Sequence, residues 1–147
     1  MQHKIIIMER NDITRSGFTL QHILLIDSMF HREDAVSFDP KVENELNINT
    51  GVNVDGKTVN VMLQVVIDQQ FEGKTQVKID VKMIGVFECV GETPLADNLE
   101  NFGRVNGAAI IFPYIREHIS NLSIKAGIPP IVLPIVNFQN AGNQHKK

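Results

Sequence analysis

The stretch FPYIREHISNLSIKAGIPPIVLPIVNF, from Phe112 to Phe138, carries two patterns that together decide the fold. Its first half continues an apolar stripe at helical spacing, which starts at Val105 and includes Ala108, Ala109, Phe112, Ile115, Ile119 and Leu122. Gly127 suits the end of that helix, and Lys125 suits its negative pole. The second half holds three prolines among apolar residues. It is therefore neither a helix interior nor a central strand.

Prolines and glycines shape the first part of this helical region. Pro113 is either the first residue of the main helix or a kink inside a longer one. Thr93 and Pro94 predict the cap and first residue of a short helix before it. Gly103 and Gly107 lie between the two helices, but their spacing matches neither phosphate-binding glycine motif. We expect these glycines to give loop freedom or close helix packing.

The sequence upstream alternates between apolar and polar residues with the period of a strand. Asp55-Gly56 and Gly73 separate the last three alternating stretches and predict tight turns between antiparallel neighbours. The first connection, residues 31–40, is longer and predicts a crossover. Within the first stretch, the alternation assigns Phe18, Leu20, Leu24, Ile26 and Phe30 to one face, and Thr19, Gln21 and Asp27 to the other. The four predicted strands lie within residues 18–30, 41–50, 58–68 and 75–87.

Four strands followed by helices predict an α+β fold. We expect a four-stranded antiparallel sheet, a meander with a crossover loop, packed on one face by a long C-terminal helix. The length of 147 residues suits a single domain spanning residues 1–147. Residues 1–16 are expected to be an N-terminal extension, and residues 139–147 a polar tail.

Composition argues against several classes of protein. The formal net charge of −3 is unlike the basic face of a nucleic-acid binder. The single cysteine, Cys89, allows no intramolecular disulfide and no cysteine-cluster zinc site, and the histidines lack metal-ligand spacing. No apolar run approaches the roughly 20 residues of a membrane helix or forms a signal peptide. We expect a cytoplasmic protein without membrane insertion, cofactor, metal or enzymatic activity.

The block from Phe112 to Phe138 closely resembles the C-terminal signature of the SecB protein-export chaperones. That signature reads F-P-Y-x-R-E, an amphipathic helix, a glycine, and a proline-bearing apolar stretch that ends in P-V-N-F. The matching positions are Phe112-Pro113-Tyr114, Arg116-Glu117, Gly127, Pro129 and Val136-Asn137-Phe138. The upstream strands fit the same family by pattern. Ile135 departs from it, and the tail is short and slightly basic where many members of the family continue into another helix and an acidic end.

The resemblance implies a fold and a function. SecB subunits assemble as a homotetramer, a dimer of dimers, and hold unfolded preproteins in apolar grooves without ATP. The translocase motor SecA then receives the preprotein on the outer face of the sheet. The predicted groove residues, for which ordinary core is the alternative, are Phe38, Val42, Leu46, Ile48, Ile131 and Leu133.

Two further sets of residues follow from the resemblance. Asp27 and Asp80 match acidic residues that dock the motor, although each also suits a plain solvated strand position. Lys78 and His31 depart from the family's pattern beside them. Ile79, Val81 and Met83 match family positions near the contact between the two dimers. The alternative for these three is the core of their own subunit.

Three functions are compatible with these residues. The first is a holdase that delivers preproteins to the Sec translocase motor. The second is a SecB-like chaperone dedicated to a narrow client, such as the antitoxin of a toxin–antitoxin system. The third is a carrier of a small apolar ligand.

Overall fold

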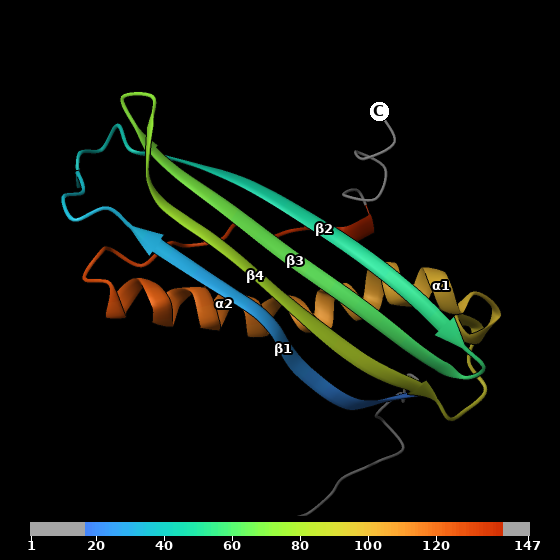
Figure 1. Ribbon diagram of the computed structural model, residues 1–147. Helices are drawn as coiled ribbons and strands as arrows, with labels where there is room; N and C mark the ends of the chain where they lie inside the picture. Colours follow the sequence, from blue (N-terminus) through green and yellow to red (C-terminus); the bar gives the residue numbers. More distant parts are fainter. Residues whose placement is uncertain (1–16, 140–147) are drawn as a thin grey trace, which may run out of the picture.

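The computed structural model describes residues 17–139. The predicted N-terminal extension, 1–16, and residues 140–147 of the predicted tail lie outside the described residues. Four strands form one antiparallel sheet in the order β1-β4-β3-β2, and a helical layer covers one face (Figure 1). This arrangement confirms the predicted fold class. The strands are β1 Phe18–Arg32, β2 Glu43–Asp55, β3 Thr58–Phe71 and β4 Lys74–Cys89.

The connections between strands follow the predicted turn residues. Gly56 joins β2 to β3 with φ at 62°, a left-handed value that favours glycine. Glu72 and Gly73 join β3 to β4, both with positive φ, as a tight hairpin of two residues requires. β1 pairs with β4 rather than with β2. The segment 33–42, here called the crossover loop, therefore carries the chain from one edge of the sheet to the other.

Two irregularities in β1 change which residues share a face. The pairing between β1 and β4 shifts register between Leu20 and His22, and again between Leu25 and Asp27. A one-residue insertion reverses the alternation of every side chain beyond it. Leu24 consequently pairs with Ile84 on the outer face, so the prediction that it shares a face with Phe18 is wrong.

The helical layer begins with the predicted cap. The side chain of Thr93 accepts a hydrogen bond from the Leu95 N–H at 3.3 Å. The 3-10 helix η2 (Pro94–Asp97), the helix α1 (Leu99–Asn101) and the π-helical turn η3 (Phe102–Gly107) then lead into α2 (Ala108–Lys125). Pro113 lies inside α2, which leaves only the second alternative, a proline within a longer helix.

The core lies between the sheet and this layer. Odd-numbered residues of β3 and β4 pack against one face of α2, where Ile111, Ile115 and Ile119 are fully buried. Gly103 and Gly107 permit this close approach, because a β-carbon at either position would come within 2.8 Å of a valine side chain. The close-packing interpretation of these glycines is thereby confirmed.

The end of α2 redirects the chain onto the sheet. Gly127 has φ at 71°, its N–H bonds to the Ile124 carbonyl at 3.1 Å, and the Ile128 N–H bonds to the Ser123 carbonyl at 3.2 Å. This pair of bonds is a Schellman motif, which satisfies the last carbonyls of a helix. The following segment returns beside α2, and the Phe138 ring meets the Phe112 ring edge-on at 5.6 Å.

Candidate functional site

Residues 129–136, here called the proline segment, form an apolar ridge beside α2. Ile131 and Leu133 are buried against the core, whereas Val132 is 83% exposed and Ile135 is 97% exposed. Three prolines restrict the backbone conformation of this segment. The ridge thus holds large apolar side chains in water without the freedom of an ordinary loop.

A pocket of about 400 Å³ lies between this ridge and the crossover loop. Three of the six predicted groove residues meet there, namely Phe38, Val42 and Ile131. Phe38 is 64% exposed, so its ring is available to a bound chain. The remaining lining residues are Ser37, Asp39, Pro40, Asn44, Gln69, Pro129, Pro130 and Val132.

The other three predicted groove residues do not line this pocket. Leu46 pairs with Ile67 and Ile48 pairs with Val65, so both face the helical layer and pack against the core. Leu133 belongs to the proline segment, and its side chain is buried against the core. Packing against the core favours the ordinary-core alternative for these three residues, and their part in a groove stays a prediction.

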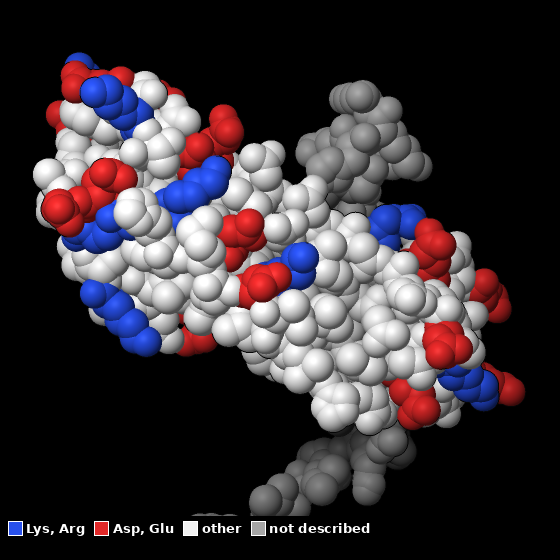
Figure 2. All heavy atoms as spheres, in the orientation of Figure 1, with Lys and Arg blue, Asp and Glu red and all other residues white. Residues whose placement is uncertain are grey.

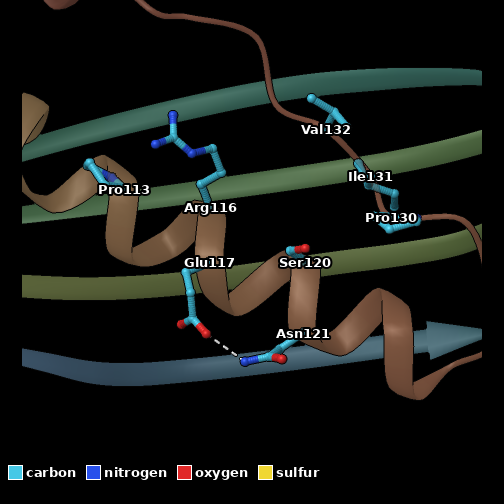
Figure 3. Close-up of a pocket in the computed structure, with 8 residues that line it drawn as sticks. All are labelled: Pro113, Arg116, Glu117, Ser120, Asn121, Pro130, Ile131 and Val132. Carbon is cyan, nitrogen blue, oxygen red and sulfur yellow. Dashed lines mark hydrogen bonds between the residues drawn. The ribbon is translucent and has the colours of Figure 1, made fainter.

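A second pocket, of about 420 Å³, lies on the other side of the ridge, between the proline segment and α2 (Figure 3). No pattern in the sequence predicts this pocket. Ile131 and Val132 line both pockets, and α2 supplies a polar wall on which Asn121 Nδ2 donates to Glu117 Oε2 at 2.6 Å. The sequence predicts the polar face of α2, but it does not predict that the proline segment lies beside that face.

A third pocket, of about 680 Å³, lies at the end of the sheet. The first half of the crossover loop and the turn between β3 and β4 form its walls. Ser37 lines both this pocket and the first one, so the crossover loop separates the two. The lining residues are Glu33, Asp34, Ala35, Val36, Ser37, Phe71, Glu72, Lys74, Thr75 and Gln76.

The outer face of the sheet carries charges of both signs (Figure 2). Asp27 Oδ2 lies 3.9 Å from Lys82 Nζ, and Asp80 Oδ1 accepts a hydrogen bond from Gln64 Nε2 at 2.9 Å. Asp27 pairs with Lys82 across the strands, which puts both predicted docking residues on this face. Its charges are interspersed rather than gathered into one acidic patch.

The two departures from the family's pattern are already engaged on this face. Lys78 Nζ lies 3.5 Å from Asp68 Oδ2, and His31 Nε2 lies 2.9 Å from Glu33 Oε2. The Thr75 hydroxyl donates to Asp68 at 2.7 Å and, together with Lys78, lowers the pKa of Asp68 below its ordinary value of 3.8. Lys78 and His31 therefore pair with Asp68 and Glu33, and neither is a direct partner of Asp27 or Asp80.

The three predicted interface residues lie inside this chain's own core. Ile79 and Val81 have 0% exposure, and Met83 is buried as well. Side chains buried within one chain offer no surface to a second copy. Burial therefore favours the intrasubunit alternative, and a charge at Val81 would disrupt folding before it tested an interface.

Within residues 17–139, no group of three or more His, Cys, Asp or Glu side chains is arranged to hold a metal ion. Cys89 is a buried free thiol at the end of β4. In the same range, no helix has the length and apolarity needed to cross a membrane.

The fold is similar to that of a solved chaperone structure. A SecB-like chaperone of Mycobacterium tuberculosis, solved with a peptide from the HigA1 antitoxin, superposes with a TM-score of 0.69 at 18% identity. The match covers 82% of this chain and 91% of that one. At this identity the likeness concerns the fold alone.

Sequence comparisons extend the likeness to the family. The family model for the preprotein translocase subunit SecB matches residues 15–147. The protein-export protein SecB of Stenotrophomonas maltophilia is 32% identical over 86% of this chain and 74% of that protein. An uncharacterized protein of Methanocaldococcus jannaschii is 26% identical over 83% of this chain and 77% of its own length. The family match across nearly the whole chain, with the 32% identity, establishes that this chain belongs to the SecB family.

Proposed function

We propose that this chain is an ATP-independent chaperone, a holdase, that binds unfolded preproteins in the cytoplasm and delivers them to the Sec translocase motor. The observation that carries the proposal is the apolar ridge of the proline segment, flanked by a pocket on each side. Membership of the SecB family supports the same function.

The physical argument begins with the exposed side chains. Phe38 on the crossover loop and Val132 on the ridge border the same pocket and remain largely in water. Unfolded chains expose apolar side chains, and burying these against such a surface stabilises the bound state. A protein that binds only the unfolded state competes with folding by mass action and needs no nucleotide. We expect an extended client segment to lie along the ridge, with side chains in both pockets.

We further propose that Asp27 and Asp80 dock a SecA-type motor. Both lie on the outer face, away from the pockets beneath the sheet, so client and motor have separate surfaces. Charges at the rim of an interface chiefly change the association rate and its salt dependence. Replacing both with asparagine should reduce salt-sensitive association with SecA, whereas Asp55→Asn at the end of β2 should not.

The proposed assembly is a homotetramer, a dimer of dimers, and β1 supports self-association. β1 is an edge strand with five exposed large apolar residues, Leu20, Leu24, Leu25, Ile26 and Met29. An edge strand of this kind is a template for pairing with another chain. The opposite edge, β2, carries Glu43, Glu45 and several asparagines, which discourage such pairing.

A second candidate is a chaperone dedicated to a narrow client. The solved structure from Mycobacterium tuberculosis holds an antitoxin peptide on the same fold. The same ridge and pockets suit a specific apolar peptide as well as a range of preproteins. Association with SecA distinguishes the two, because only the export function needs it.

The direct test is an aggregation assay. Purified chain should keep a slow-folding preprotein soluble at stoichiometric concentration without ATP. A carrier of small apolar ligands would not do so. Failure to suppress aggregation of any unfolded client would overturn the holdase function itself.

A further inference from the structure

A β-bulge near the start of β4 places one glutamine under the crossover loop. The pairing of β3 with β4 shifts between Gln69 and Gln70, so that Gln76 becomes the extra residue between Thr75 and Val77. A bulge re-aims side chains and frees a backbone group from the ladder. Gln76 and Val77 are both buried as a result, although they are neighbours in a strand.

Gln76 then bonds to the crossover loop at two points. Its backbone carbonyl accepts a hydrogen bond from the Glu33 N–H at 2.9 Å, which continues the pairing of β1 with β4 by one residue. Its side-chain Oε1 accepts from the Ser37 N–H at 2.8 Å, and its Nε2 donates to the Ser37 carbonyl at 3.0 Å. The amide thus pairs with Ser37 as a neighbouring strand would. One residue holds both ends of the loop's first half.

The contacts continue away from the loop. Gln76 Nε2 also donates to Gln69 Oε1 at 2.9 Å, and Gln69 Nε2 donates to Asn44 Oδ1 at 3.1 Å. Gln76 is only 7% exposed, so an unpaired amide here would be costly. The chain of amides joins the crossover loop to β4, β3 and the start of β2.

A second anchor fixes the start of the loop. The Arg32 guanidinium donates to the carbonyls of Glu33 at 2.8 Å, Asp34 at 2.8 Å and Ala126 at 2.6 Å. Ala126 is the C-cap residue of α2 and lies three residues before the proline segment. The loop and the ridge are therefore held in one frame.

We propose that Gln76 is a positioning residue for client binding, which holds Ser37 so that Phe38 and Val42 face the ridge across a preformed pocket. This inference rests on the proposed function and names the device that shapes its site. Ser37 lines both the first and the third pocket, so releasing it would merge the two. An ordered binding surface loses less conformational entropy when the client binds, which raises affinity.

The test compares Gln76→Met with wild type and with Gln64→Ala as the control. Methionine fills the buried space but cannot bond to Ser37. Gln64 bonds to Asp80 on the outer face and does not touch the loop. The probe is fluorescently labelled, carboxymethylated α-lactalbumin, a permanently unfolded client, with binding read by anisotropy. Amide hydrogen exchange at Ser37, read by NMR, reports the tether directly.

We expect Gln76→Met to raise the dissociation constant about tenfold and to speed Ser37 exchange by a similar factor. A tenfold change in the dissociation constant corresponds to about 1.4 kcal/mol of binding free energy. Gln64→Ala should change neither. Gln76→Asn retains a buried amide but is one methylene too short to reach Ser37. It replaces Gln76→Met as the test variant if the latter folds poorly, and we expect the same loss of affinity.

The outcomes separate the two proposals. Unchanged affinity in a folded Gln76→Met or Gln76→Asn overturns the positioning role, even if Ser37 exchange accelerates. Weaker binding with unchanged Ser37 exchange overturns it too, because the tether would then be irrelevant. Absence of client binding by wild type would instead contradict the holdase function.

Discussion

Gly85 on β4 faces Ile111 on α2 so closely that a β-carbon at position 85 would stand 2.8 Å from Ile111 Cδ1. The same β-carbon would also stand 3.0 Å from the Phe87 ring. Gly85 is therefore one of the positions that set the distance between the sheet and its helical layer.

Gly85→Ala should destabilise the fold. Extra atoms in a packed core force neighbouring side chains or backbone to move, which costs about 1–3 kcal/mol. The free energy of unfolding, measured in urea, checks this. Gly51→Ala on β2 is the control, because its β-carbon would meet only the Met62 side chain, whose flexible end is the nearest atom at 3.4 Å. Equal losses in the two variants would show that the helix does not pack closely at Gly85.

Phe38→Ala should weaken client binding about tenfold, as expected for an aromatic anchor at a binding pocket, with little loss of stability. The ring is mostly in water, so its removal leaves no cavity. Val90→Ala is the matched control, because Val90 is also exposed, at 57%, and lines none of the three pockets. Anisotropy with the unfolded client measures both. A Phe38→Ala variant with wild-type affinity would remove Phe38 from the site.

Ile26→Lys should shift the protein toward smaller oligomers. A charge on an exposed apolar edge strand opposes pairing of that edge with a second copy. Asn49→Lys, on the opposite edge strand β2, should leave the oligomer intact. Light scattering after size-exclusion chromatography gives the mass of each. If Ile26→Lys keeps the wild-type mass, β1 is not the pairing edge.

The pH dependence of stability should include a contribution from Asp68. The pKa of this carboxyl is lowered in the folded protein, first by the Thr75 hydroxyl and then by Lys78. Its contribution to stability is therefore present above the unfolded-state pKa and is lost as pH falls through the folded-state pKa. Urea unfolding of wild type and Asp68→Asn should differ most at neutral pH and converge in acid. A constant difference across that range would contradict the assignment, and Asp55→Asn serves as the control.

Much of the fold was predictable because its signals are local. Alternation marks strands, and the apolar stripe of α2 and the glycine at position 127 mark the helix and its end. The two bulges in β1 were not predictable, because a bulge is set by pairing with β4 rather than by the strand's own residues. Alternation alone therefore puts Leu24 on the wrong face.

The site was predictable only in part, for a similar reason. Phe38, Val42 and Ile131 meet at one pocket, but Leu46 and Ile48 have the same apolar alternation and face the core instead. A strand pattern gives the face on which a residue lies, not what covers that face. Gln76 carried no signal in the sequence, because its role depends on a register shift and on a loop distant in the chain.

The paired irregularities of β1 also constrain how relatives are compared. After the first insertion the inner and outer sides of the strand exchange, and after the second they exchange back. A relative that lacks one of the two would present Asp27 to the helical layer and bring an apolar neighbour to the water. In an alignment, a one-residue gap between Leu20 and Asp27 therefore needs to be placed so that residues on the same side of the sheet are matched. An alignment based on residue identity alone would equate residues with opposite surroundings.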